Sequence, residues 1–203
     1  MKDFKTYLTE SSGLHVFDID DTLLRTNAKI RVRDHTNRII RYLTNREFND
    51  YKLRPGEKFD FDEFRSSKKF RQESEPIHPM IKKLNAIHRN ITRSGRKSKI
   101  IMNTAREDFD DKEDVLAKFR DHGVDIDKMH IHRAGNEPGD DIPAVKKNKV
   151  LRRHLDTGDY THVNMYDDSK TNLHHFLTLQ NEYPHIKFNA WHVDENGKTK
   201  KYK

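Results

Sequence analysis

A short apolar run, residues 14–17, leads directly into three closely spaced acids, Asp18, Asp20 and Asp21. The run follows a glycine and is too short for a helix, a pattern that predicts a strand buried on both faces. This strand would end in a cluster of carboxylates, which repel one another and stay ionised only where a cation or strong donors compensate. A divalent metal ion would meet that need. The same acids would also suit a metal-free turn that caps the next helix.

A second predicted strand, residues 161–166, ends in the same way, in Asp167 and Asp168, with Asn172 a turn further on. By itself this stretch is equally compatible with a polar turn before a helix. Two buried strands that are separated by helices and both end in carboxylates, however, predict one cleft at the carboxyl edge of a parallel sheet. Oxygen ligands of this kind favour Mg²⁺ over zinc.

The rest of the chain alternates between strand and helix patterns outside one segment, residues 27–78. We expect strands near 99–104, 129–133 and 186–193, helices over 80–94, 110–122, 141–155 and 171–180, and a ragged strand at the end. The segment itself is expected to form a hairpin of strands at 28–33 and 38–43, a short helix capped by Thr44, a loop over 53–58 and a polar helix over 60–72. It is best explained as an insertion into the core.

The pentapeptide Asp18-Ile-Asp-Asp-Thr22, placed after an apolar strand, resembles motif I of the haloacid dehalogenase (HAD) superfamily of phosphotransferases. The resemblance implies that Asp18 is the nucleophile, that Asp20 is the general acid and base, and that Thr22 helps to fix the loop. The chemistry suits these residue types, because a carboxylate can attack phosphorus and a second carboxyl can move the proton.

The other three HAD motifs have counterparts in the expected order. Thr104, which ends an apolar strand, matches motif II and is placed to hydrogen-bond a phosphoryl oxygen. For the motif III lysine we take Lys147, with Lys146 and Lys149 as alternatives. The Asp167–Asp168 pair resembles motif IV. It implies a direct metal ligand at Asp167, while Asp168 would act through water or hold Lys147.

The resemblance implies a three-layer α/β sandwich with a mostly parallel sheet. Its catalytic core would consist of residues 1–26 and 79–203, and a small cap of residues 27–78 would be inserted after the first strand. It also implies Mg²⁺-dependent phosphomonoester hydrolysis through an aspartyl-phosphate. The metal would be held by the motif I and motif IV acids, with Asp20 contributing its main-chain carbonyl. In size and layout the chain is similar to small HAD phosphatases of bacteriophages.

Composition bears mainly on the substrate. The 203-residue chain carries a formal net charge of +7, which favours anionic partners. We expect a small phosphorylated substrate such as a nucleotide or sugar phosphate; the alternatives are a 3′-phosphatase for nucleic-acid ends and a non-catalytic phosphate-binding protein. The chain has no cysteine, no secretory signal pattern at residues 1–12 and no apolar stretch long enough to span a bilayer. A cytoplasmic protein without membrane partners is therefore expected, and the oligomeric state is left open.

Overall fold

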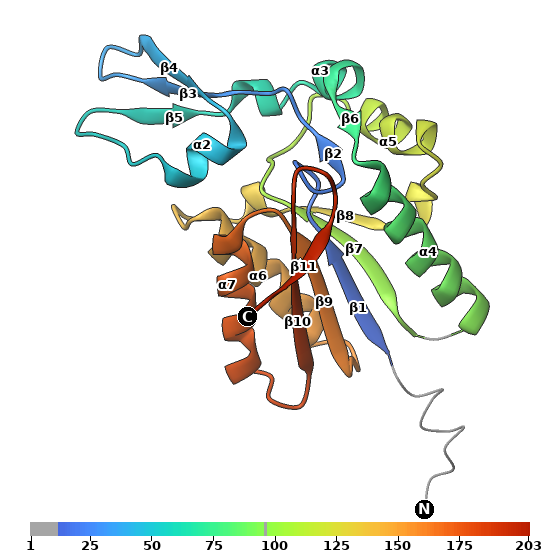
Figure 1. The fold of residues 1–203 in the computed structure, drawn as a ribbon. Helices are drawn as coiled ribbons and strands as arrows, with labels where there is room; N and C mark the ends of the chain where they lie inside the picture. Colours follow the sequence, from blue (N-terminus) through green and yellow to red (C-terminus); the bar gives the residue numbers. More distant parts are fainter. Residues whose placement is uncertain (1–11, 96) are drawn as a thin grey trace, which may run out of the picture.

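A six-stranded sheet forms the centre of the computed structural model, which describes residues 12–95 and 97–203 (Figure 1). The strand order is β11-β10-β9-β1-β7-β8, and β1 pairs in parallel with both β7 and β9. Among the described strands of this sheet, only β11 is antiparallel to its neighbour. The strands are β1 (Gly13–Phe17), β7 (Lys99–Thr104), β8 (His130–Arg133), β9 (His162–Asp167), β10 (Lys187–Val193) and β11 (Thr199–Tyr202). The predicted mixed α/β fold with a mostly parallel sheet is thus confirmed.

Helices pack on both faces of this sheet. Phe17 and Met102 join the apolar side chains of α4 and α5 in one cluster, whereas Leu14 and Ile101 join those of α6 and α7 in another. Alternate side chains of a strand point to opposite faces, so each central strand serves both clusters. The helices are α4 (His78–Ser94), α5 (Lys112–Asp121), α6 (Pro143–Leu155) and α7 (Lys170–Thr178), each within two residues of its predicted bounds. The arrangement is compatible with an α/β sandwich.

The chain between β1 and α4 forms a smaller, antiparallel sheet with the order β4-β3-β5. The predicted hairpin is present as β3 (Ile30–Arg33) and β4 (Ile39–Leu43), and Thr44 caps α2 (Asn45–Asp50) in a capping box with Glu47, as expected. This sheet has its own apolar cluster, which includes Ile30, Val32, Leu43 and Phe64.

The helix predicted over residues 60–72 is wrong in its first half. The chain instead forms β5 (Lys58–Asp60), the 3₁₀ helix η1 (Asp62–Phe64) and α3 (Ser67–Glu73). Asp60 is held in the sheet opposite Arg31, and its carboxylate accepts the main-chain N–H of Asp62, which turns the chain before a helix can form. Phe70 of α3 packs into the main core cluster, so the end of the segment lies against the core.

The remaining short elements connect these parts. No helix among the described residues combines the length and apolar character needed to cross a bilayer. Residues 1–11, which the sequence assigns to the core, lie outside the described residues. The short elements are the paired strands β2 (Leu24–Arg25) and β6 (Glu75–Pro76) and the 3₁₀ helices η2 (Ile126–Lys128), η3 (Ala134–Asn136) and η4 (Leu179–Asn181).

Leu84→Ala tests the packing of α4 on the sheet. Leu84 is fully buried in the main cluster, so its truncation should lower the free energy of unfolding by about 2–5 kcal/mol. Lys82→Ala, at an exposed position of the same helix, should change it by no more than about 0.5 kcal/mol. Urea denaturation of both variants measures the difference, and equal effects would mean that α4 does not pack as described.

Candidate active site

The loop after β1 is tightly hydrogen-bonded. The main-chain N–H of Asp18 donates to the carbonyl of Tyr166 in β9 at 3.0 Å, and those of Leu23 and Leu24 both donate to the carbonyl of Ile19. Asp21 adopts a left-handed conformation with φ of 56°, which is unfavourable for most residues but tolerated by short polar ones. The chain therefore folds back directly after Asp20. This turn fixes the main chain of the loop that carries Asp18 and Asp20, the two catalytic candidates.

The acid at the end of β9, Asp167, is likewise held by hydrogen bonds. Asp167 is 0% exposed, and its Oδ1 accepts the main-chain N–H of Ser169 at 2.9 Å and the Asn172 side-chain amide at 3.0 Å. Ser169 is also the N-cap of α7, so the residue that begins this helix donates its main-chain N–H to the Asp167 carboxylate. Asn172, noted in the sequence beside motif IV, therefore orients an acid.

The two acidic loops meet at the carboxyl edge of the sheet, as the sequence predicts. Side-chain oxygens of Asp18, Asp167 and Asp168 lie within 4.8 Å of one another. Thr22 joins the loops directly, because its hydroxyl accepts the main-chain N–H of Asp168 at 3.1 Å and lies 3.5 Å from that residue's Oδ1. Thr22 is fully buried, so this contact is shielded from water.

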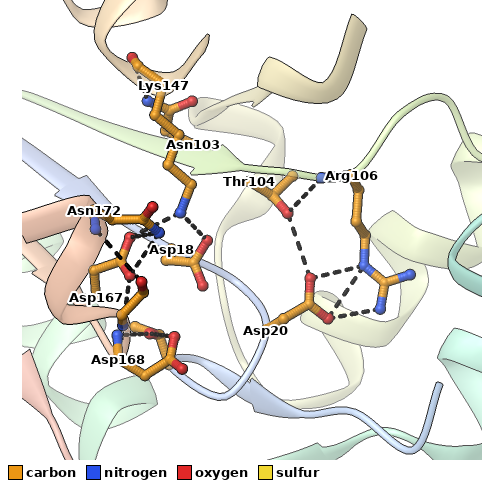
Figure 2. A network of polar contacts seen from close by, with 11 residues as sticks. Asp18, Asp20, Asn103, Thr104, Arg106, Lys147, Asp167, Asp168 and Asn172 are labelled. Carbon is orange, nitrogen blue, oxygen red and sulfur yellow. Dashed lines mark hydrogen bonds and ion pairs between the residues drawn. The ribbon is translucent and has the colours of Figure 1, made fainter. Parts of the chain in front are cut away.

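Lys147 is the lysine that reaches this cluster. Its side chain is 2% exposed, and its Nζ donates to Asp18 Oδ1 at 2.6 Å and to Asp167 Oδ2 at 2.7 Å (Figure 2). The alternatives point elsewhere: Lys146 donates to the carbonyl of Gly135, and Lys149 pairs with Asp141. The ammonium group contacts Asp18 and Asp167, while Asp168 bonds Thr22. Asp168 therefore does not hold Lys147, which was one of its two expected roles.

The charges of this cluster do not balance. Burial raises the pKa of Asp18, with Lys147 opposing the shift, and burial also raises the pKa of Asp168 well above its usual value, helped by Asp167. Burial alone would lower the pKa of Lys147, but the carboxylates of Asp167 and Asp18 outweigh it and raise that pKa. With all three carboxyls ionised, the single ammonium group of Lys147 would leave two negative charges, and this repulsion adds to burial in raising the pKa values of Asp18 and Asp168. A divalent cation with a preference for oxygen ligands would compensate these charges.

Asp20 points away from the trio and is bound by a different cation (Figure 2). Arg106 Nη2 lies 2.6 Å from Asp20 Oδ1, and Nε lies 2.9 Å from Oδ2. Thr104 Oγ1 is 3.4 Å from Oδ2 and accepts the main-chain N–H of Arg106 at 3.2 Å. The predicted site residue Thr104 therefore lies beside the candidate acid and base.

Arg106 and Asn103 are the site residues that sequence reasoning missed. Asn103 donates from its side-chain amide to the main-chain carbonyl of Lys147 at 3.1 Å, which ties α6 to β7 next to the cluster. Both residues flank the predicted motif II threonine at the end of β7. The available sequence signals were Asn103, a polar residue inside an apolar strand, and Arg106, a charged residue just after that strand.

Comparisons of the chain with protein-family models, with curated proteins and with solved structures find no match. The comparisons thus assign no family. A functional assignment for this chain rests on the four sequence motifs and on the contacts that bring their residues together.

Lys147→Met removes the ammonium group but keeps the length of the side chain. The variant leaves the buried carboxylates of Asp18 and Asp167 without their cation, so the free energy of unfolding in metal-free buffer should fall by about 3–5 kcal/mol. Lys146→Met, one position earlier, should change it by no more than about 0.5 kcal/mol. Denaturant titration compares the two, and equal losses would contradict the placement of Lys147.

Proposed function

We propose that this chain is a phosphotransferase of the HAD type, in which Asp18 is the nucleophile. Within that class we propose a Mg²⁺-dependent phosphomonoester hydrolase that acts on small phosphorylated metabolites such as nucleotides. One observation carries the proposal: Lys147 binds both Asp18 and Asp167, so the motif I and motif IV acids share one buried cluster with the motif III lysine.

The proposed reaction has two steps. In the first, an oxygen of Asp18 forms a bond to phosphorus while the ester P–O bond breaks, and the leaving alkoxide takes a proton from Asp20. In the second, Asp20 takes a proton from water, whose oxygen attacks phosphorus and releases phosphate and the free Asp18 carboxylate. Splitting one hydrolysis into two displacements lowers each barrier. Lys147 and Thr104 would stabilise the equatorial oxygens.

The donor set suits a magnesium ion, because it offers only oxygen atoms and an excess of negative charge. Asp18, Asp167 and the main-chain carbonyl of Asp20 would hold it, with Asp168 close enough to ligate directly or through water. When bound, the ion would draw the phosphate toward Asp18 and offset the repulsion between two anions.

The 27–78 segment is the proposed cap. Its helix α2 reaches the catalytic loop, where the Asn45 side-chain amide donates to Asp21 Oδ2 at 3.0 Å. A cover in direct contact with the loop favours a small substrate over a nucleic-acid end.

A panel of phosphorylated metabolites and 3′-phosphorylated oligonucleotides, assayed with Mg²⁺, would identify the substrate. Loss of activity on oligonucleotides with rising salt would mark a polymer substrate.

Asp18→Asn tests the nucleophile. Because an amide cannot attack phosphorus, the turnover of p-nitrophenyl phosphate should fall at least about 1,000-fold, which corresponds to about 4 kcal/mol of barrier. Asp140→Asn, at an exposed position that is not part of the cluster, should retain activity. Circular dichroism checks that both variants fold, and wild-type turnover by a folded Asp18→Asn protein would exclude the proposed mechanism.

Magnesium is tested by activity and by stability. EDTA should abolish phosphate release and excess Mg²⁺ should restore it. Independently, Mg²⁺ at about 100 times its dissociation constant should stabilise the fold by about 2.7 kcal/mol, read as a rise in melting temperature. Asp167→Asn should remove most of this rise, and Asp140→Asn should keep it. Full activity in chelator, or the same rise in Asp167→Asn, would argue against a metal at this cluster.

A further inference from the structure

Arg106 is a buried cation whose partners come from separate parts of the chain. Its guanidinium, on a side chain that is 2% exposed, binds the Asp20 carboxylate in the core. Nη1 donates to the main-chain carbonyl of Phe64 at 2.7 Å, and Nη2 lies 3.2 Å from Thr26 Oγ1. Thr26 lies where the chain leaves the core for the proposed cap, and Phe64 lies at the end of the small sheet's apolar cluster.

Aromatic rings complete the surroundings of this guanidinium. Its central carbon lies 4.7 Å from the ring centre of Phe64, 4.8 Å from that of Phe70 and 5.2 Å from that of Phe109. A guanidinium tolerates such burial because it is weakly hydrated, stacks on rings and has donors in a fixed plane. Phe64 and Phe70 belong to η1 and α3, so two of the three rings around Arg106 come from the inserted segment.

We propose that Arg106 is a positioning residue that couples the orientation of Asp20 to the seating of the 27–78 segment on the core. The proposal rests on the proposed function of Asp20 as general acid and base. The two nitrogen contacts from Arg106 fix the plane of the Asp20 carboxylate. The contacts with Phe64 and Thr26 in turn fix the orientation of the Arg106 guanidinium. A displaced segment would release Arg106 and, with it, the geometry that proton transfer to the leaving group requires.

The dependence of rate on the leaving group separates this role from a merely structural one. Arg106→Lys keeps the charge but loses the fork and cannot bond both Asp20 and Phe64 in the same way. Turnover of alkyl phosphates, whose alkoxides must be protonated, should fall about 100-fold or more. Turnover of p-nitrophenyl phosphate, whose leaving group needs little help, should fall less than about 10-fold. Asp20→Asn should show the same pattern, and the double variant should lose little more than either single one.

Leu84→Ala is the matched structural control, because it weakens the main apolar cluster without removing a polar contact of Asp20 or Arg106, and it should lower the rates for all substrates by one common factor. A common factor for Arg106→Lys as well, or losses that simply multiply in the double variant, would overturn the proposal. An absence of phosphate release from every ester by the wild-type protein would instead refute the proposed function.

The link to the segment can be measured without any substrate. Thr26→Val removes one acceptor of Arg106, and Asp20→Asn removes its charged partner. Both should speed amide hydrogen exchange at residues 64–66 several-fold and leave exchange in α4 unchanged. Thr92→Val, at an exposed position of α4 away from Arg106, should leave residues 64–66 unaffected. Unchanged exchange at 64–66 in both variants would overturn the coupling.

Discussion

The parallel pairing of β1 with β9 is the constraint on which the candidate site depends. In this register Phe17 lies opposite Tyr166, so Asp18 and Asp167 emerge side by side at the same edge of the sheet. Their repulsion would destabilise a buried edge without a cation, and Lys147 supplies one from α6. The position of α6 is in turn tied to β7 through Asn103, so the helix that compensates the charge is fixed by the neighbouring strand.

The fold separates its acids into two electrostatic environments. Asp18 and Asp167 share Lys147 and lie beside Asp168, so three acids gather around one cation, whereas Asp20 is matched by the guanidinium of Arg106. Two residues of sequence are enough for this separation, because Asp18 lies at Lys147 while the Asp20 side chain lies at Arg106, directly before the turn at Asp21 (Figure 2). Under the proposed function, these two environments would assign attack and metal binding to one group of carboxylates and proton transfer to Asp20.

The sequence predicts many of the helices and strands well because their signals are local. Apolar runs such as 14–17 and capping residues such as Thr44 specify their elements with neighbouring side chains alone. The resemblance favours Lys147 among three lysines, but only the packing of α6 places its ammonium group in the cluster. Arg106 could not be assigned, since its partners come from distant segments and are partly main-chain atoms that no side-chain pattern encodes. The charged strand β5 likewise depends on pairing with β3, not on its own pattern.

The inserted segment consists of two parts that are attached differently. Its end, α3, is integrated into the core: Phe70 packs in the main cluster, and the main-chain N–H of Ser67 donates to Asp110 at 2.8 Å. The small sheet has its own apolar cluster, and the neighbouring helix α2 contacts the loop after β1 through the polar bond from Asn45 to Asp21. Polar contacts between separately packed clusters open at lower free energy than a shared core does. A displacement of the small sheet would therefore leave α3 in place, and Arg106, which contacts Phe64 and Phe70, lies where the two parts meet.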